Sequence, residues 1–270
     1  MGKFSGVLLA SDYDDTLIAH DGTFPARNAQ ALAYFTAEGG RFTLATGRGH
    51  GPVSRLVSRF PINAPVIETN GTRIYDFQSG QELYAATMDP SIAPLVAELM
   101  ADFPLLSVEC FAGDGIYVER PNFVAAEHAQ RIGQVIPERP MQSIPQPWTK
   151  LLLQEHHDYL LPIQARIQRD YGDRFEALFS MPTYLEVFRK GCSKGAALLE
   201  LAQRLQIDPA DTYAVGDGDN DISMLRAAGD SFCCGGGSEA AKAAAGHVVG
   251  LCADGALADV VDYLDRIYPR

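Results

Sequence analysis

The hydrophobic pattern at the start of the chain consists of short, continuous apolar runs separated by amphipathic stretches. Continuous apolar runs are typical of strands covered on both faces, whereas apolar residues at helical spacing predict helices packed on a sheet. The predicted strands cover 6–10, 42–45 and 65–69, and the predicted helices cover 25–38 and 50–60. A strand, helix, strand, helix, strand order with short links predicts a parallel sheet.

The pattern changes between about residues 81 and 186, where the segments are longer and more amphipathic. The predicted strands there are Ser107–Phe111, Gly115–Glu119, Lys150–Gln154, Phe175–Ser180 and Tyr184–Phe188. The predicted helices cover 90–102, 122–134 and 157–171. The turn Ala112-Gly113-Asp114-Gly115 predicts antiparallel pairing of two of these strands. We therefore interpret 81–186 as a separate α+β domain.

The first pattern returns after Lys194. Further helices are predicted over 194–205, 221–228, 238–245 and 257–267, and further strands over 212–215, 231–234 and 247–250. The predicted fold class is therefore α/β. A parallel-sheet domain is formed by 1–80 and 187–270, and the α+β domain, 81–186, is inserted into it.

Composition and charge narrow the classes of partner. Hydrophobic residues make up 47% of the 270 residues, which is enough for a full core, and the net charge is −12. Such an acidic chain is not expected to bind nucleic acid, which usually meets a basic face, or an anionic membrane. No apolar stretch approaches the ~18 residues that span a bilayer, and the N-terminal apolar run is too short for a signal peptide.

The five cysteines are scattered along the chain and do not predict a disulfide framework. We expect reduced thiols and a cytoplasmic location. Adjacent Cys233 and Cys234 are interpreted as small apolar residues at a buried strand end rather than as a redox or metal motif, because neighbouring strand residues point to opposite faces.

A first pair of carboxylates, Asp12 and Asp14, comes directly after the first predicted strand. Residues at i and i+2 project the same way, and this edge of an open α/β sheet is where ligands bind. Two carboxylates this close repel each other unless a cation lies between them or one holds a proton, and Mg²⁺ also binds phosphate oxygens. The pair therefore indicates a metal and phosphate site, with a solvated acidic turn as the alternative.

A second acidic motif, Gly216-Asp217-Gly218-Asp219-Asn220-Asp221, follows the predicted strand 212–215. Its carboxylates also call for a cation or a strong set of hydrogen-bond donors. The motif superficially resembles a calcium loop, but it lacks the glutamate that such a loop requires near its end.

Two further motifs supply groups that bind phosphate. Thr46, Gly47 and Arg48 follow the second predicted strand, where the hydroxyl and a backbone N–H can bind a phosphate oxygen and the arginine can pair with substrate or a carboxylate. Lys194 opens a predicted helix, although the helix dipole favours a negative group there. A cation at this position indicates a functional role, namely binding the nucleophile and the transferred phosphoryl group.

Together these motifs resemble those of the haloacid dehalogenase superfamily of phosphatases, and more closely its Cof-like hydrolases with a type-IIB cap. The motifs that carry the resemblance are Asp12-Tyr13-Asp14-Asp15-Thr16-Leu17, Thr46-Gly47-Arg48, Asn70-Gly71, Lys194, the Gly216–Asp221 motif and Asp254-Gly255-Ala256. The resemblance covers the whole chain. It departs at Asp15, where the family usually has glycine, and at Gly235-Gly236-Gly237, where the family has Gly-Asn-Ala.

The resemblance implies a Rossmann-like parallel-sheet core with helices on both faces, formed by 1–80 and 187–270, and a cap, 81–186, that sets substrate specificity. It implies a Mg²⁺-dependent phosphatase that hydrolyses a small phosphorylated metabolite, such as a sugar phosphate, through an aspartyl-phosphate. That metabolite is the expected partner, and the protein is expected to be a monomer or a weak homodimer.

The resemblance also implies a role for each motif residue. Asp12 attacks phosphorus, and Asp14 protonates the leaving oxygen and then deprotonates the attacking water. The implied metal site consists of Asp12, the backbone carbonyl of Asp14, and Asp217, with Asp221 in support. The phosphate and substrate contacts are Thr46, Gly47, Arg48, Asn70, Lys194 and Asn220, of which Thr46 and Lys194 also count as catalytic.

Three other functions stay open on the sequence alone. They are a phosphomutase or phosphotransferase of the same superfamily, a phosphoacceptor switch and a non-catalytic phosphometabolite-binding protein. A phosphoacceptor domain is much shorter and lacks both the 81–186 insert and the second acidic motif, and the filled catalytic positions argue against a binding protein. Product analysis separates hydrolysis from phosphoryl transfer.

Overall fold

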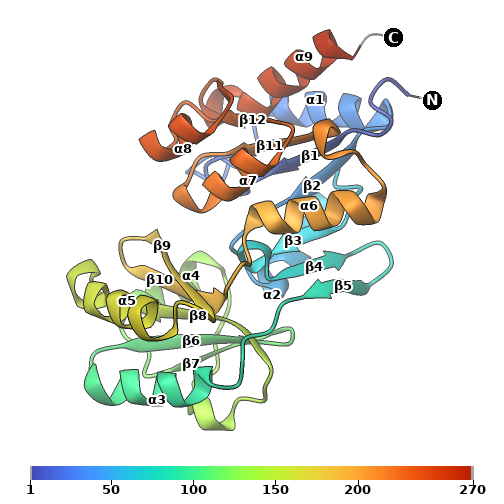
Figure 1. The fold of residues 1–270 in the computed structure, drawn as a ribbon. Coiled ribbons are helices and arrows are strands. Elements are labelled where there is room, and N and C mark those ends of the chain that lie inside the picture. Colours follow the sequence, from blue (N-terminus) through green and yellow to red (C-terminus); the bar gives the residue numbers. More distant parts are fainter. Residues whose placement is uncertain (1, 269–270) are drawn as a thin grey trace. The chain divides into compact units, whose positions relative to one another are not determined.

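The computed structural model describes residues 2–268, which form two compact units (Figure 1). The first unit comprises the chain up to Gly47, Ser54–Tyr84 and the chain from Ser193 onward. The second comprises Arg48–Val53 and Ala85–Cys192. The main segment of this unit, Ala85–Cys192, starts later than the insert predicted over 81–186. The reason is that the strand before this segment is still part of a small sheet of the first unit.

The first unit is built on a parallel sheet of five strands in the order β13-β12-β11-β1-β2. The strands are β1 (Leu8–Ser11), β2 (Arg41–Leu44), β11 (Thr212–Gly216), β12 (Asp230–Cys233) and β13 (His247–Val248). In the neighbouring strands β1 and β11, Ser11 lies opposite Val215. The carboxyl ends of these two strands therefore meet at one edge, and the predicted parallel sheet is confirmed.

Helices cover both faces of this sheet, as predicted (Figure 1). The helices that pack on it are α1 (Ala26–Ala37), α6 (Lys194–Leu205), α7 (Ile222–Ala227), α8 (Glu239–Ala244) and α9 (Ala256–Ile267). α1 packs against α9, and α6 packs against α7. Leu8 and Ala10, which share one face of β1, join Leu198 and Leu201 of α6 in one buried cluster.

A second, three-stranded sheet adjoins the first, in the order β3-β4-β5. Its strands are β3 (Val66–Glu68), β4 (Arg73–Asp76) and β5 (Gln81–Ala85). β3 pairs antiparallel with β4 and makes one parallel bridge to the main sheet, from Ile67 to Ala45. The hydrophobic pattern does not predict β4 or β5, because both are short and β5 is partly exposed along its whole length.

The helix predicted over 50–60 is too long. The structure has a short helix, α2 (His50–Ser54), and a separate 3₁₀ turn over Val57–Arg59. Phe60 is extended, at φ −129° and ψ 156°, because the ring of the following Pro61 disfavours a helical conformation in the residue before it.

The second unit is built on an antiparallel sheet in the order β7-β6-β8-β10-β9. Its strands are β6 (Ser107–Ala112), β7 (Gly115–Glu119), β8 (Trp148–Gln154), β9 (Phe175–Met181) and β10 (Tyr184–Arg189), and its helices are α3 (Ile92–Asp102), α4 (Phe123–Arg131) and α5 (His157–Tyr171). The predicted turn between β6 and β7 joins two antiparallel strands, with Ala112 opposite Gly115.

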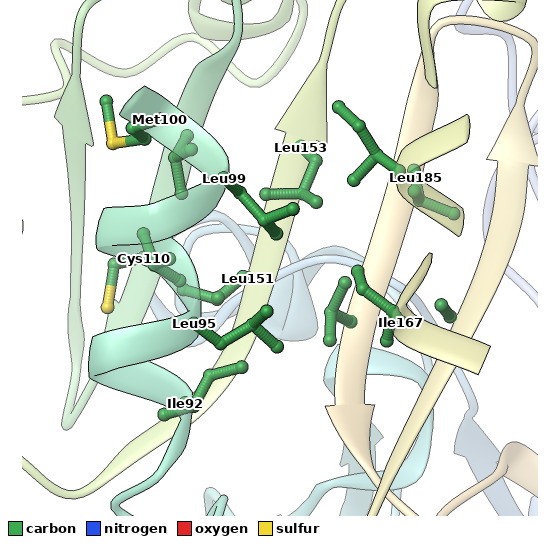
Figure 2. Close-up of a cluster of buried hydrophobic side chains, with 14 of the residues drawn as sticks. Ile92, Leu95, Leu99, Met100, Cys110, Leu151, Leu153, Ile167 and Leu185 are labelled. Carbon is green, nitrogen blue, oxygen red and sulfur yellow. The ribbon is translucent and has the colours of Figure 1, made fainter. Parts of the chain in front are cut away.

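The two faces of this second sheet have different cores. Leu151 and Leu153 of β8 pack with Leu95 of α3 and Ile167 of α5 in a large buried cluster (Figure 2). Leu152, which points to the opposite face, belongs to a smaller cluster that includes Val124 of α4. The alternation along β8 therefore places helices on both sides of the sheet.

All five cysteines have free thiols and are buried. Cys233 and Cys234 lie at the end of β12 and are nearly inaccessible, in agreement with the interpretation as a buried strand end. Within residues 2–268, no helix has both the length and the apolar composition needed to cross a bilayer.

Candidate active site

The carboxyl ends of β1 and β11 bring the two acidic motifs together. Asp12 follows β1 and donates its backbone N–H to Val215 O of β11, at 2.9 Å. Asp217 follows β11 directly, and Asp221 lies in the 3₁₀ turn that comes next. Two segments about 200 residues apart in sequence thus present carboxylates at one edge of the sheet, as parallel pairing of their strands requires.

Lys194 connects these carboxylates. Its Nζ lies 2.5 Å from Asp12 Oδ1 and 2.6 Å from Asp221 Oδ1, and its side chain is fully buried. The helix that it begins, α6, is capped by Ser193, whose side chain accepts a hydrogen bond from Ala196 N. The cap provides an acceptor for one of the backbone N–H groups that the first turn of a helix leaves without a partner.

Three carboxylates form a candidate cation site. Asp12, Asp217 and Asp221 each offer one oxygen, and these oxygens lie within 4.8 Å of one another. One ammonium, from Lys194, leaves two of the three negative charges uncompensated, which is the charge of one divalent cation. Carboxylate oxygens are the ligands that Mg²⁺ prefers in proteins, so the donor set fits this ion.

Burial sets the proton affinity of these groups. It raises the pKa of Asp12 well above its ordinary value, with Lys194 opposing the rise and Asp221 and Asp217 adding to it. Burial also raises the pKa of Asp217 to about 6, against a hydrogen bond from Thr16 that lowers it. For Lys194, burial acts to lower the pKa, but the carboxylates of Asp12 and Asp221 outweigh it and raise the pKa. The site is short of positive charge.

Asp221 has both oxygens engaged. Oδ1 accepts from Lys194, and Oδ2 accepts the backbone N–H groups of Asp217 and Gly218, each at 2.9 Å. Gly216 is required here, because a Cβ at that position would lie 2.6 Å from Asp221 Cβ. Asp221 therefore fixes the loop that carries Asp217 and orients the lysine.

The predicted phosphate contacts gather around Asn70. Asn70 N donates to Thr46 O at 2.9 Å, and Asn220 Nδ2 donates to Asn70 Oδ1 at 3.2 Å. A Cβ on Gly47 would lie 3.1 Å from the same amide oxygen. Gly71 follows at φ +93°, with so little space beside the Ser193 carbonyl that any side chain would clash. Four of the predicted contact residues are thus held in one group.

Asp14 and Arg48 differ from the clustered residues in exposure or in the unit that carries them. Asp14 is exposed, and its carboxylate is not one of the three clustered ligands; the contact predicted for it is through its backbone carbonyl. Arg48 belongs to the second unit. Asp15 has φ +57°, a left-handed conformation, which explains why glycine is usual at this position in the family that the motifs resemble.

The last of the three glycines at 235–237 packs against the second acidic motif. A Cβ on Gly237 would approach Cys233 Sγ to 2.6 Å and Asp217 O to 2.8 Å. The next residue, Ser238, donates its backbone N–H to that same Asp217 carbonyl at 2.8 Å. The third glycine of the departure is therefore set by close packing.

One residue that contacts the site has no role in the sequence prediction. Thr16 lies within the first motif, and its Oγ1 is 2.6 Å from Asp217 Oδ1. The sequence gives a weak signal for it, namely a hydroxyl two residues after Asp14 in a loop that is otherwise acidic or apolar. The contact joins two motifs 201 residues apart, so sequence spacing alone does not reveal it.

Replacing Lys194 with methionine is expected to lower the free energy of unfolding of the metal-free protein by about 3–5 kcal/mol, because it leaves buried carboxylates without their partner. Urea unfolding in EDTA measures the change. Lys190→Met is the matched control, since Lys190 is half exposed and pairs with Glu176 at 2.9 Å. Such a pair contributes less than about 1 kcal/mol. Equal losses in the two variants would contradict the importance of the buried pairs.

Comparisons with known proteins identify a matching family, similar sequences and similar folds. A family model described as haloacid dehalogenase-like hydrolase matches residues 9–261. A relative from Escherichia coli O6:H1 named HMP-PP phosphatase is 30% identical over 272 residues, covering 97% of each chain. Two solved structures share the fold. A haloacid dehalogenase-like hydrolase from Bacteroides thetaiotaomicron has 24% identity and a TM-score of 0.84, covering 96% of this chain and 99% of that one. A HAD subclass IIB sugar phosphatase has 22% identity and a TM-score of 0.85, covering 95% and 98%.

Proposed function

The chain belongs to the haloacid dehalogenase-like hydrolases, and from this membership we propose that it is a Mg²⁺-dependent phosphatase of a small phosphorylated metabolite. The observation that carries the proposal is the cluster of Asp12, Asp217 and Asp221, in which buried Lys194 pairs with the first and the last. A carboxylate nucleophile, an ammonium and a cation-binding acid set are the groups that phosphoryl transfer to an aspartate requires.

In the proposed reaction, an Asp12 oxygen forms a bond to phosphorus while the bond from phosphorus to the leaving oxygen breaks. Asp14 gives its proton to that oxygen, and the dephosphorylated product departs. Water then attacks the aspartyl-phosphate and passes a proton to Asp14, which releases inorganic phosphate and regenerates the Asp12 carboxylate. The exposure of Asp14 suits a group that must exchange protons with both a leaving group and water.

The other residues of the group position the phosphoryl oxygens in this proposal. Lys194, already 2.5 Å from Asp12, lies where it can bind the nucleophile and the transferred group together. Thr46 and Asn220 supply a hydroxyl and an amide, and Asn70 orients the amide through its own oxygen. Gly47 keeps backbone close to Asn70, where a side chain would narrow the site.

Asp12, the backbone carbonyl of Asp14 and Asp217 would hold the cation, with Asp221 fixing the loop behind them. A bound Mg²⁺ supplies positive charge that keeps Asp12 ionised and stabilises charge on the phosphoryl group. We propose that Arg48 contacts the substrate and that the second unit determines which substrate is accepted, as the family resemblance implies.

Purified protein is expected to release inorganic phosphate from p-nitrophenyl phosphate in Mg²⁺ and to lose this activity in EDTA, because the acid set then has no cation to offset its charge. Excess Mg²⁺ should restore it. The same measurement over HMP-PP, the substrate in the name of the Escherichia coli relative, and over sugar phosphates ranks the substrates. Activity that survives exhaustive EDTA treatment would contradict the metal requirement. Phosphate that moves to a second hydroxyl of the substrate, without release, would identify a mutase instead.

A further inference from the structure

A buried hydroxyl in the first acidic motif, that of Thr16, contacts one of the three clustered carboxylates, Asp217. Thr16 is fully inaccessible, and its Oγ1 lies 2.6 Å from Asp217 Oδ1. An ionised carboxylate is a pure acceptor, so the hydroxyl donates. A hydrogen bond between a hydroxyl and a carboxylate at this distance is charge-assisted and about twice as strong as a neutral one.

The backbone around Thr16 is held from two sides. Leu17 N and Ile18 N both donate to Tyr13 O, at 3.2 and 3.0 Å, which closes the turn that carries Thr16. From the far end of the chain, Cys252 Sγ lies 3.0 Å from Thr16 O. Threonine is also stiff at χ1 because it is branched at Cβ. The hydroxyl is therefore placed by a rigid support.

Asp217 needs such a support, because the hydrogen bonds that fix its backbone do not fix its side chain. Its N–H donates to Asp221 Oδ2, and its carbonyl accepts from Ser238 N, so the backbone is secured. Neither bond limits rotation of the carboxylate. In the part of the chain that the structure describes, the hydrogen bond that fixes the carboxylate is the one from Thr16.

We propose that Thr16 is a positioning residue that holds the Asp217 carboxylate in the orientation that binds the divalent cation. With Oδ1 bound to the hydroxyl, the carboxylate cannot rotate freely, and one of its oxygens stays within 4.8 Å of carboxylate oxygens of Asp12 and Asp221. Groups that orient metal ligands in this way typically change metal affinity about 10- to 100-fold when removed. The inference rests on the proposed function, because it needs the acid set to bind a cation.

The test is Mn²⁺ binding to the substrate-free protein, measured by the loss of the free Mn²⁺ signal in electron paramagnetic resonance. Thr16→Val keeps the shape of the side chain and removes the hydroxyl, so the Kd is expected to rise at least about 10-fold. Thr16→Ser restores the hydroxyl and is expected to stay within about 3-fold of the wild type. Thr16→Ala repeats the deletion in a smaller side chain in case the valine variant does not fold.

Thr43→Val is the matched control. Thr43 is equally buried, in β2 of the five-stranded sheet, but its hydroxyl donates to a backbone carbonyl, Pro65 O, at 2.6 Å. It should lose stability like Thr16→Val and keep the wild-type Kd for Mn²⁺. In turnover assays, Thr16→Val should need more Mg²⁺ for half-maximal activity and reach nearly the wild-type kcat when Mg²⁺ is saturating.

An unchanged Kd in both Thr16→Val and Thr16→Ala would overturn the inference while leaving the proposed phosphatase intact. An equal rise in Thr43→Val would also overturn it, since the effect would then come from general loss of stability. A wild-type protein that binds no Mn²⁺ at all would remove the metal site itself, and with it both the inference and the proposed metal dependence.

Discussion

Asp12→Asn is expected to lower phosphatase activity by at least ~10³-fold while the fold is kept. The substitution preserves the shape of the side chain and leaves an amide oxygen that can still accept from Lys194, so the buried contact at 2.5 Å has a partner. An amide oxygen is a far weaker nucleophile than a carboxylate. Loss of the covalent step should therefore lower kcat much more than it raises KM.

The direction in which Asp12→Asn changes the stability of the metal-free protein can also be predicted. Burial raises the pKa of Asp12 in the metal-free fold. At a pH above the ordinary pKa of aspartate, the ionised carboxyl is therefore more stable in the unfolded chain than in that fold. The ionised carboxyl thus destabilises the metal-free fold at neutral pH, and a neutral asparagine removes that cost. Thermal unfolding in EDTA should give a Tm for Asp12→Asn equal to or above that of the wild type.

Asp15→Asn is the matched control for Asp12→Asn. Asp15 is half exposed, and asparagine tolerates its left-handed φ of +57° as well as aspartate does. It makes the same chemical change three residues away and should keep activity within a few-fold of the wild type. An Asp12→Asn protein with near-normal turnover, beside an equally active Asp15→Asn, would place the attacking group elsewhere.

The sequence allows the elements that carry the site to be predicted well, because each is defined by local signals. Helix α6 spans Lys194–Leu205, the predicted range, since Ser193 caps it and its apolar face repeats at helical spacing. β11 ends at Gly216, the first residue of the acidic motif that follows the predicted strand. In a parallel sheet, strand ends meet at one edge, so these local signals predict that both acidic motifs lie at that edge.

What the sequence leaves undetermined depends on partners distant in the chain. The order of strands in the main sheet places β1 between β11 and β2, and no local pattern encodes that neighbour choice. The contact from Thr16 to Asp217 depends on it as well. The β4–β5 hairpin is stabilised by pairing with β3 rather than by an apolar run of its own, so the hydrophobic pattern misses it.

The distribution of charge explains why the cluster needs so many supports. Three carboxylates close together, two of them buried and one partly buried, are unfavourable in a metal-free protein, and the raised pKa values of Asp12 and Asp217 express that cost. Lys194 and the two backbone N–H groups bound to Asp221 offset part of it. In the proposed function a bound cation would offset the remainder, and stability would then be coupled to metal binding.

Asp14→Asn is expected to discriminate between substrates by their leaving groups, which makes it a sharper test than the loss of the nucleophile. An alkyl oxygen, as in a sugar phosphate, needs a proton as it departs, whereas p-nitrophenolate leaves without one. The variant should lose about 10²- to 10⁴-fold in phosphoryl transfer from the sugar phosphate and much less from p-nitrophenyl phosphate. The rate of product release in the first turnover, measured by rapid quench, separates this step from the later ones.

The same variant should accumulate the aspartyl-phosphate. With p-nitrophenyl phosphate the first step still proceeds, but no base remains to activate the water that hydrolyses the intermediate on Asp12. Acid-quenched Asp14→Asn protein should therefore carry covalent phosphate, whereas Asp12→Asn treated in the same way should carry none, because its acceptor is gone. Equal losses on both substrates, with no phosphoprotein after the quench, would mean that Asp14 acts through its place in the metal site rather than as the acid and base. The exposed position of its carboxylate, outside the buried cluster, makes us expect the first result.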